Sequence, residues 1–260
     1  MQASGDPQAA PAAKESTAGE ASNGAIVSCA GLSRRFGEGD TAVDALREVS
    51  LKFPPGELTA IVGPSGSGKS TLMHVLAGLD RPTGGKCWID GVEVTGLDDQ
   101  RLTNLRRDKL GFVFQFFNLV PVLNAEENIT LPARIAGRRA DHEWLEKLLD
   151  TVGIADRRTH RPSELSGGQQ QRVAIARALI SRPAVVFADE PTGNLDSTSS
   201  KDVLDLLRRS VDEFGQTVIM VTHDARSASY ADRVVGLVDG EVSADRRIES
   251  EDEVIDLMRT

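Results

Sequence analysis

Hydrophobic and polar positions follow two different spacings along this chain, and the two kinds of segment alternate. Short apolar runs bounded by turn residues occupy positions 58–62, 184–188 and 217–222 and are typical of parallel strands buried on both faces. Segments 69–79 and 197–214 repeat apolar residues every three or four positions, which predicts amphipathic helices. The alternation predicts an α/β fold with a mostly parallel sheet, in which the helix at 197–214 crosses between two strands.

Other segments predict antiparallel pairing beside this sheet. Residues 25–36 and 49–57 mix alternating and apolar positions, which indicates strands joined by turns and an antiparallel β subdomain. Residues 86–94 and 233–242 each carry an Asp-Gly pair, which favours the tight turn of a β-hairpin.

Helical patterns dominate from about residue 97 to residue 182, interrupted by a strand-like segment at 111–115 and an apolar loop at 116–123. Strand patterns lie on both sides of this region, so we interpret it as a helical insertion into a core that is discontinuous in sequence. We expect a disordered N-terminal tail at 1–24, one domain at 25–245, and a charged C-terminal tail or short, loosely docked helix at 246–260.

The composition is that of an ordinary globular protein, with 40% hydrophobic and 27% charged residues. No apolar run approaches the roughly 20 residues that a membrane helix needs, so we expect no direct membrane insertion. The first 24 residues contain no Leu, Ile, Val or aromatic residue, and they lack the basic start and apolar centre of a signal peptide. We therefore expect a cytoplasmic chain whose tail is disordered; a tail that binds a partner is the alternative.

Charge and cysteine content exclude further classes. The net charge of −9 disfavours general binding to nucleic acid or to an anionic membrane surface, so we expect no nucleic-acid partner. Cys29 and Cys87 form no C-x-x-C pair, and we expect them to be buried free thiols.

A glycine-rich stretch, GPSGSGKST at 63–71, joins the strand predicted at 58–62 to the helix predicted at 69–79. This is the context of a P-loop, in which glycines let backbone N–H groups converge on a phosphate beside a helix N-terminus. Lys69 is expected to reach the β- and γ-phosphates and Ser70 to coordinate Mg²⁺. The motif predicts a nucleoside triphosphate site without distinguishing a kinase, GTPase, helicase or transporter ATPase. The residues expected to contact the nucleotide are Gly63, Pro64, Ser65, Gly66, Ser67, Gly68, Lys69, Ser70 and Thr71.

Three side chains follow two of the predicted parallel strands. Asp189 and Glu190 come directly after the run at 184–188, and His223 follows the run at 217–222. Ligands of open α/β sheets bind at the carboxyl ends of the strands, so we expect all three beside the phosphates. Asp189 would help hold Mg²⁺, Glu190 would polarise the attacking water, and His223 would contact the γ-phosphate or orient the water. A solvated acidic loop and a structural histidine are the alternatives.

Gln115 lies where the core passes into the helical region. A neutral amide at such a junction can contact Mg²⁺ or water in one domain position and withdraw in another. The spacing alone supports this assignment only weakly.

A second glycine pair opens the helix predicted within 165–179, LSGGQQQRVAIARAL. Ser166 can cap this helix, while Gly167 and Gly168 leave its first N–H groups free to bind an anion. No lysine, strand-end acid or water-activating group adjoins the segment, so it can bind phosphate without readily cleaving it. Taken alone, a capped helix packed through its glycines is the simpler interpretation, with Arg172 and Arg177 on its polar side.

Together these residues closely resemble the ATP-binding subunits of ABC transporters, over residues 25 to about 245. The run 105–132 and the segment 165–179 resemble the lipoprotein-release and macrolide-export group, with the cell-division ATPase of the FtsE type as a near relative. The matching motifs occur in the family's order: Walker A at Gly63–Thr71, the Q-loop Gln115, the signature at 165–169, Walker B at 184–190, the D-loop at 193–196 and the switch histidine His223.

The resemblance implies a P-loop ATPase that uses ATP and Mg²⁺, with Phe36 stacked on the adenine. It implies that two copies pair head to tail, each ATP lying between the Walker A residues of one copy and the signature of the other. It also implies that Gln115 and the loop 116–123 pass movement to a separate integral-membrane permease at the inner face of the cell membrane. The residues implied to act on the partner copy's ATP are Ser166, Gly167, Gly168, Gln169 and Asp196.

Two other classes of function compete with a transporter subunit. A superfamily ATPase acting on DNA or ribosomes is expected to carry paired cassettes, long coiled coils or zinc modules, and this sequence shows none of them. A purely regulatory nucleotide-binding module would be expected to lack Lys69 or Glu190, and both are present. The sequence leaves open the substrate, and with it the choice among export, lipoprotein extraction and mechanical signalling to cell-wall enzymes.

Overall fold

The computed structural model describes residues 24–259, so the tail predicted at 1–24 lies almost entirely outside the described residues. A six-stranded sheet forms its centre, in the order β10-β9-β3-β8-β7-β6. The pairs among β9, β3, β8, β7 and β6 are parallel, and β10 is antiparallel to β9, as the apolar runs and the last hairpin predict. The strands are β3 (Leu58–Val62), β6 (Leu110–Phe114), β7 (Val185–Asp189), β8 (Val218–Val221), β9 (Arg233–Val238) and β10 (Glu241–Arg247).

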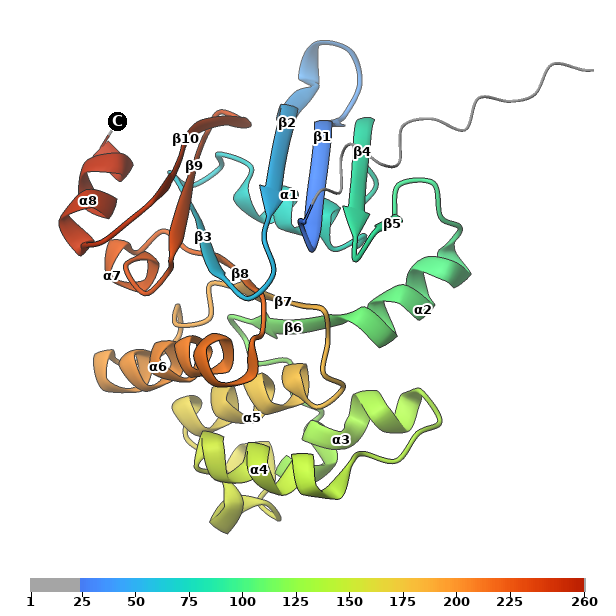
Figure 1. Ribbon diagram of the computed structural model, residues 1–260, viewed down its shortest axis with the longest axis vertical. Coiled ribbons are helices and arrows are strands. Elements are labelled where there is room, and N and C mark those ends of the chain that lie inside the picture. The colour runs from blue at the N-terminus through green and yellow to red at the C-terminus, as the bar shows by residue number, and fades with distance from the viewer. Residues whose placement is uncertain (1–23, 260) are drawn as a thin grey trace, which may run out of the picture.

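A second, four-stranded antiparallel sheet lies beside the first, in the order β2-β1-β4-β5 (Figure 1). The turn between β4 and β5 is formed by Asp90 and Gly91, whose φ angles are 47° and 75°. Two consecutive positive φ angles are what a tight hairpin turn of the predicted kind requires, and Asn, Asp and Gly tolerate them best. The strands are β1 (Val27–Phe36), β2 (Val43–Phe53), β4 (Gly84–Ile89) and β5 (Val92–Glu93).

Helices cover the two faces of the central sheet separately. Successive side chains of a strand point to opposite faces, and β3 shows the consequence. Ile61 packs in one core cluster with Leu72 of α1 (Lys69–Leu76), together with the antiparallel sheet. Ala60 packs in the other cluster, with Val173 of α5 (Gly167–Leu179) and with α6 (Ser197–Phe214). The helices α1 and α5 therefore lie on opposite faces of the sheet (Figure 1).

The predicted helical region contains four helices and one strand of the central sheet. The strand-like interruption at 111–115 is β6, which pairs in parallel with β7. The helices α3, α4 and α5 form a layer on one face of the sheet, whereas α2 reaches outward from β6 and buries Leu102 in the cluster of α1 (Figure 1). The four helices are α2 (Asp99–Lys109), α3 (Ala125–Ile135), α4 (His142–Val152) and α5; short 3-10 turns occupy Gly39–Thr41, Ala155–Arg157 and Pro162–Glu164.

The C-terminal segment is more ordered than its charge predicts. Residues up to Arg247 extend β10 along β9, and α8 (Glu251–Arg259) packs against α7 (Ala225–Ala228). Val254 and Leu257 of α8 are buried, so the helix is firmly docked rather than loose. Between residues 24 and 259, no helix has the length and apolar character needed to cross a membrane.

Candidate nucleotide-binding site

The glycine-rich loop between β3 and α1 has a backbone shape that only glycine fits. Gly63 has a φ of 150°, and a Cβ atom placed on it would lie 2.0 Å from the carbonyl oxygen of Leu237. Gly68 has a φ of 100°, and a Cβ atom there would lie 2.2 Å from the carbonyl oxygen of Ala45. The loop is therefore wedged between β2 and β9, and it leads directly into the start of α1.

The Lys69 ammonium and the Ser67 hydroxyl are two polar groups of this loop that could bind an anion. The Lys69 Nζ atom donates to the carbonyl oxygens of Gly63 and Pro64, at 2.9 and 2.7 Å. Burial lowers the pKa of Lys69, and the nearby carboxylates of Glu190 and Asp189 oppose that effect. The Ser67 Oγ atom is buried and has no hydrogen-bond partner among the described residues. An ammonium, an unpaired hydroxyl and a helix N-terminus together fit a polyphosphate.

Ser70 and Asp189 bring two oxygen ligands together at the end of β7. The Ser70 Oγ atom lies 3.4 Å from Asp189 Oδ1, and burial raises the pKa of Asp189. Among the described residues no group of three or more His, Cys, Asp or Glu side chains could hold a metal ion alone. Mg²⁺ prefers hard oxygen ligands and usually takes one or two from the protein and the rest from phosphates and water. The pair fits a Mg²⁺ ion bound together with a nucleotide.

Glu190 and His223 meet at the same edge of the sheet, as the positions after β7 and β8 predict. The Nδ1 atom of His223 lies 2.8 Å from Oε1 of Glu190. The backbone of Glu190 has a φ of 45°, and its N–H donates to the carbonyl of Val221, which fixes the turn from which the carboxylate projects. A carboxylate held against an imidazole beside a phosphate cradle can accept a proton from water.

The second glycine pair opens α5 with a complete capping box. Ser166 Oγ accepts a hydrogen bond from the Gln169 N–H, and Gln169 Oε1 accepts one from the Ser166 N–H, at 3.2 and 2.9 Å. A Cβ atom on Gly168 would lie 2.8 Å from Ser199 Oγ of α6, whereas one on Gly167 would meet only ordinary contacts. The helices α5 and α1 cover opposite faces of the sheet, and among the described residues no hydrogen bond joins the signature residues 166–169 to the loop at 63–71.

Gln115 and Asp196 have partners in this structure other than nucleotide ligands. Gln115 Nε2 donates to Asn194 Oδ1 at 3.2 Å, and among the described residues no hydrogen bond joins Gln115 to Ser70 or Asp189. Asp196 caps α6, and hydrogen bonds from Ser199 lower its pKa. The structure therefore does not bring Gln115 into contact with the predicted Mg²⁺ ligands.

Phe36 ends β1 and is 42% exposed. The guanidinium of Arg34 lies over its ring, 4.3 Å from the centroid. An exposed aromatic ring with a cation on one side leaves its other side for a flat partner.

Two residues of α5 carry no distinctive sequence signal, yet their side chains join the helix to distant segments through hydrogen bonds to backbone carbonyls. Gln171 is fully buried, and its Nε2 donates to the carbonyls of Phe114 and Pro191, at 3.2 and 2.6 Å. Arg177, expected on the polar side of the helix, instead donates to carbonyls of the loop after β6. Their partners lie far away in sequence, so periodicity alone could not identify either role.

The arrangement agrees with what comparison with known proteins finds. A model of the ABC transporter family matches residues 46–193, more than half of the chain, including the P-loop, the second glycine pair and the acids after β7. The chain belongs to the ABC transporter family. It is an ATP-binding cassette with ATPase activity, and its fold is that of the family's P-loop ATPases.

Relatives of this ABC cassette differ in length. It is 49% identical to the lipoprotein-releasing system ATP-binding protein LolD of Geobacter metallireducens, covering 82% of this chain and 96% of the relative. It is 45% identical to the macrolide export ATP-binding/permease protein MacB of Bdellovibrio bacteriovorus, covering 86% of this chain. The chain spans only 34% of the length of that MacB protein.

A solved structure shows a related ATP-binding cassette as a dimer. The ATP-binding cassette MJ0796, a protein of Methanocaldococcus jannaschii, was solved as a dimer in a post-hydrolysis state bound to ADP and Pi. Its chain superposes with a TM-score of 0.78 at 41% identity, covering 86% of this cassette and all of the other chain.

Proposed function

We propose that this cassette is the ATP-hydrolysing subunit of a transporter that exports a substrate or extracts a lipoprotein or lipid from the membrane. In this proposal it works at the inner, cytoplasmic face of the cell membrane, attached to a separate permease. The observation that carries the proposal is the joint placement of Lys69, Ser70, Asp189, Glu190 and His223 around one phosphate cradle. The names of the LolD and MacB relatives support the transport role.

Each residue at the phosphate cradle has a separate role in this proposal. The glycine-rich loop and Lys69 bind the β- and γ-phosphates. Ser70 and Asp189 would hold Mg²⁺, and Gln115 would be a further ligand. Bound Mg²⁺ would neutralise charge on the phosphate oxygens. Glu190 accepts a proton from the attacking water, and His223 holds the Glu190 carboxylate and contacts the γ-phosphate. Phe36 stacks on the adenine with the ring face that Arg34 leaves open.

The second glycine pair completes the site of another copy. Two cassettes pair head to tail, so that Ser166, Gly167, Gly168 and Gln169 of one face the ATP held by the other, and Asp196 links the two sites. Support comes from the opposite placement of α1 and α5 on the sheet and from the dimer of MJ0796. ATP then favours the closed pair because its γ-phosphate contacts both copies, and hydrolysis weakens that pair.

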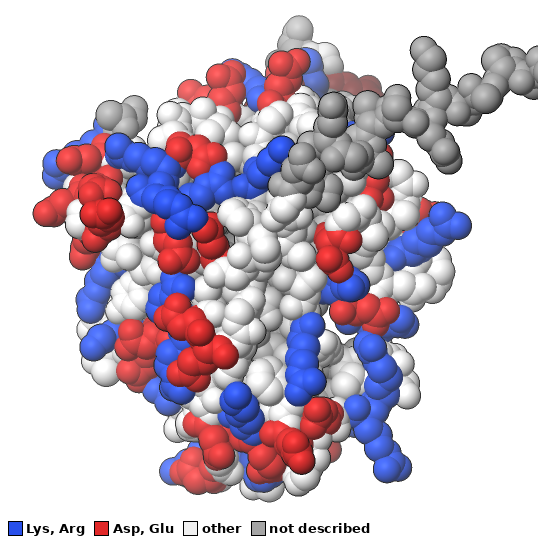
Figure 2. All heavy atoms as spheres, viewed as in Figure 1, with Lys and Arg blue, Asp and Glu red and all other residues white. Residues whose placement is uncertain are grey.

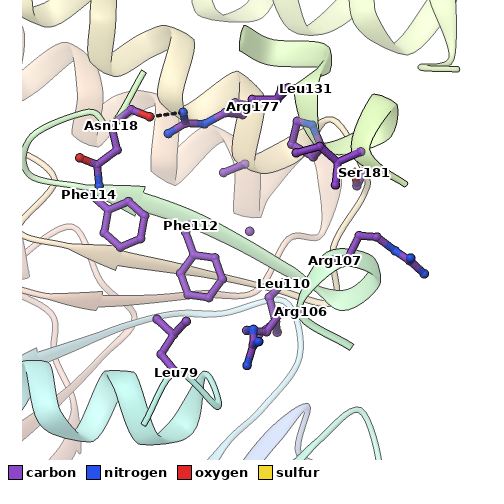
Figure 3. A pocket seen from close by; sticks show the side chains of 14 residues that line it. Leu79, Arg106, Arg107, Leu110, Phe112, Phe114, Asn118, Leu131, Arg177 and Ser181 are labelled. Carbon is purple, nitrogen blue, oxygen red and sulfur yellow. Dashed lines mark hydrogen bonds between the residues drawn. The ribbon is translucent and has the colours of Figure 1, made fainter. Parts of the chain in front are cut away.

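An apolar groove beside β6 is suited to a helix of the permease. It has a volume of about 410 Å³, and Leu79, Phe112, Phe114 and Ile135 contribute to its lining (Figure 3). Phe112 and Phe114 stack with centroids 5.7 Å apart, and Ile135 is 70% exposed at the end of α3. An exposed apolar groove of this kind marks an interaction site, and an amphipathic helix is one partner that fits it.

The rim of the groove extends the interface predicted for Gln115 and the loop 116–123. Phe116 of that loop is 73% exposed, while Asn118 lines the groove itself. Arg106 and Arg107 of α2 lie at the rim, and Lys and Arg side chains gather over α2 and the end of α3 (Figure 2). We expect the permease helix to carry an apolar stripe flanked by polar residues, because Arg107 is already paired with Asp108.

Complementation between two inactive variants tests the shared site. Lys69→Ala removes the phosphate-binding ammonium, and Ser166→Arg blocks the second glycine pair; each alone should abolish hydrolysis. Mixed together, they form pairs in which one site has an intact Lys69 and an intact Ser166, so phosphate release should reappear. Absence of any recovery, with both variants folded and the Ser166→Arg variant still binding ATP, would contradict the shared site. The double variant mixed with itself is the control.

A further inference from the structure

Arg177 of α5 is tied to the backbone of the loop that follows β6. Its Nη1 donates to the carbonyl of Asn118 at 2.6 Å (Figure 3). Its Nη2 donates to the carbonyl of Phe117 at 2.8 Å. The planar guanidinium thus bridges two consecutive carbonyls, which a lysine ammonium does not do with the same geometry.

The guanidinium has no other electrostatic role within the described chain. Among residues 24–259 no carboxylate lies within ion-pair distance of Arg177, although the neighbouring Arg172 pairs with Asp202. Burial lowers the pKa of the Arg177 guanidinium. The guanidinium is half-buried at the wall of the groove, and the two carbonyls are the partners that compensate its charge there.

The two carbonyls belong to residues in an unfavourable backbone conformation. Phe117 has a φ of 61° and Asn118 a φ of 50°. Asparagine enters this left-handed region at modest cost, but a phenylalanine there has to be held by its surroundings. Arg177 supplies such a restraint from one side, and the buried Asn128 anchors the far end of the loop through Val120 and Leu123.

The same loop also touches the start of α5. A Cβ atom built on Gly167 would lie 3.6 Å from Cζ of Phe117, so the ring rests against the first turn of the helix. The loop is therefore connected to α5 at both ends of the helix, through the Phe117 ring and through the Arg177 side chain.

We infer that Arg177 is a positioning residue that makes the conformation of residues 116–118, and so the shape of the permease groove, follow the position of α5. The inference rests on the proposed function, in which the start of α5 binds the partner copy's ATP and the groove receives the permease. It adds the physical connection between those two surfaces. When ATP draws the start of α5 against a second copy, Arg177 pulls the two carbonyls with it.

Hydrogen–deuterium exchange on the full chain tests this connection without the permease. The measurement uses the Glu190→Gln background, with and without ATP and Mg²⁺, and follows the amides of 116–123 and of 165–169. Arg177→Met should raise the exchange rate at Phe117 and Asn118 at least tenfold without nucleotide, and it should abolish any ATP-dependent change there. Arg177→Lys should give an intermediate increase. Arg172→Met is the matched control, because it removes an arginine of the same helix that does not touch the loop.

The outcomes separate the two proposals. If Phe117 and Asn118 exchange equally in Arg177→Met and Arg172→Met, or if ATP still changes their exchange in Arg177→Met, the inference is wrong. If ATP fails to protect 165–169 in the background protein itself, head-to-tail pairing is wrong, while the nucleotide-free comparison still decides whether Arg177 restrains the loop. Should Arg177→Met not fold, Arg177→Lys against Arg172→Lys gives the same comparison.

Discussion

The imidazole of His223 and the carboxylate of Glu190 face each other across the ends of two neighbouring parallel strands, with Nδ1 and Oε1 2.8 Å apart. Neither residue would reach the other if β7 and β8 were not adjacent and in register, with Asp189 opposite Val221. The sheet therefore brings together the pair proposed to activate water, and the P-loop that follows the next strand, β3, is proposed to bind the phosphates of the nucleotide. Both halves of the chemistry depend on the same sheet edge.

Removing the Glu190 carboxylate should affect hydrolysis far more than ATP binding. Glu190→Gln keeps the side-chain shape but no longer accepts a proton, so single-turnover phosphate release should fall by about 10²-fold or more. His223→Gln should also slow release. His142→Gln, at an exposed position on α4, is the control and should behave as the parent protein. Undiminished release from Glu190→Gln would assign the base to another residue.

The buried carboxylate of Asp189 should make stability depend on pH. Its folded pKa is raised, so its contribution to stability is fully present below the unfolded pKa of about 3.9 and is lost as the pH rises through the raised value. Asp189→Asn should therefore melt higher than the parent protein at pH 7.5, and this gain should shrink toward pH 4. Asp196→Asn is the opposite control, because the folded pKa of Asp196 is lowered and its carboxylate stabilises the fold above the unfolded pKa. This variant should therefore melt lower than the parent protein at pH 7.5. Thermal unfolding of all three proteins at both pH values gives the comparison.

Close packing of α5 on α6 should make an alanine substitution more destabilising at Gly168 than at Gly167. Gly168→Ala places a Cβ atom 2.8 Å from Ser199 Oγ and should lower the free energy of unfolding by about 1–3 kcal/mol. Gly167→Ala meets no such clash, and its effect should stay within roughly 1 kcal/mol in either direction. Urea denaturation of the two variants measures both values. Equal stability of the variants would show that α6 yields to the added methyl group.

A charge placed in the groove should detach the cassette from membranes. Ile135→Glu puts a carboxylate where the permease helix is expected to bury apolar surface, so the fraction of protein recovered with source-cell membranes should fall about tenfold or more. Val43→Glu is the control at a similarly exposed apolar position, 62% exposed on β2 and outside the groove. Equal recovery of the two variants would place the permease elsewhere.

Local signals in the sequence predict much of this fold. The helix α6 begins after its capping residue Asp196 and ends at Gly215, whose φ of 64° closes it, so amphipathic spacing and caps define both ends. The turn at Asp239 and Gly240 is equally local. The buried strands follow from apolar runs, because only a sheet covered on both faces needs them.

Features that depend on contacts between distant segments are not predictable in this way. Arg246 and Arg247 fall in the predicted charged tail, but pairing with Val234 and Arg233 of β9 makes them the end of a strand. Arg177 is predicted on the polar side of α5, yet its partners are carbonyls about 60 residues earlier in the chain. Gln171 likewise donates to carbonyls of two distant segments, at Phe114 and Pro191. The groove combines Leu79 with Ile135, which no motif connects.

The central claim is that two copies share each ATP, and sedimentation of the Glu190→Gln variant tests it most directly. A variant that binds ATP and hydrolyses it slowly should sediment as a 27.9 kDa monomer without nucleotide and at twice that mass with ATP and Mg²⁺. Adding Ser166→Arg should keep it a monomer in both conditions while ATP still binds. A Glu190→Gln protein that stays monomeric with ATP bound, or one whose dimer is indifferent to Ser166→Arg, would contradict the account.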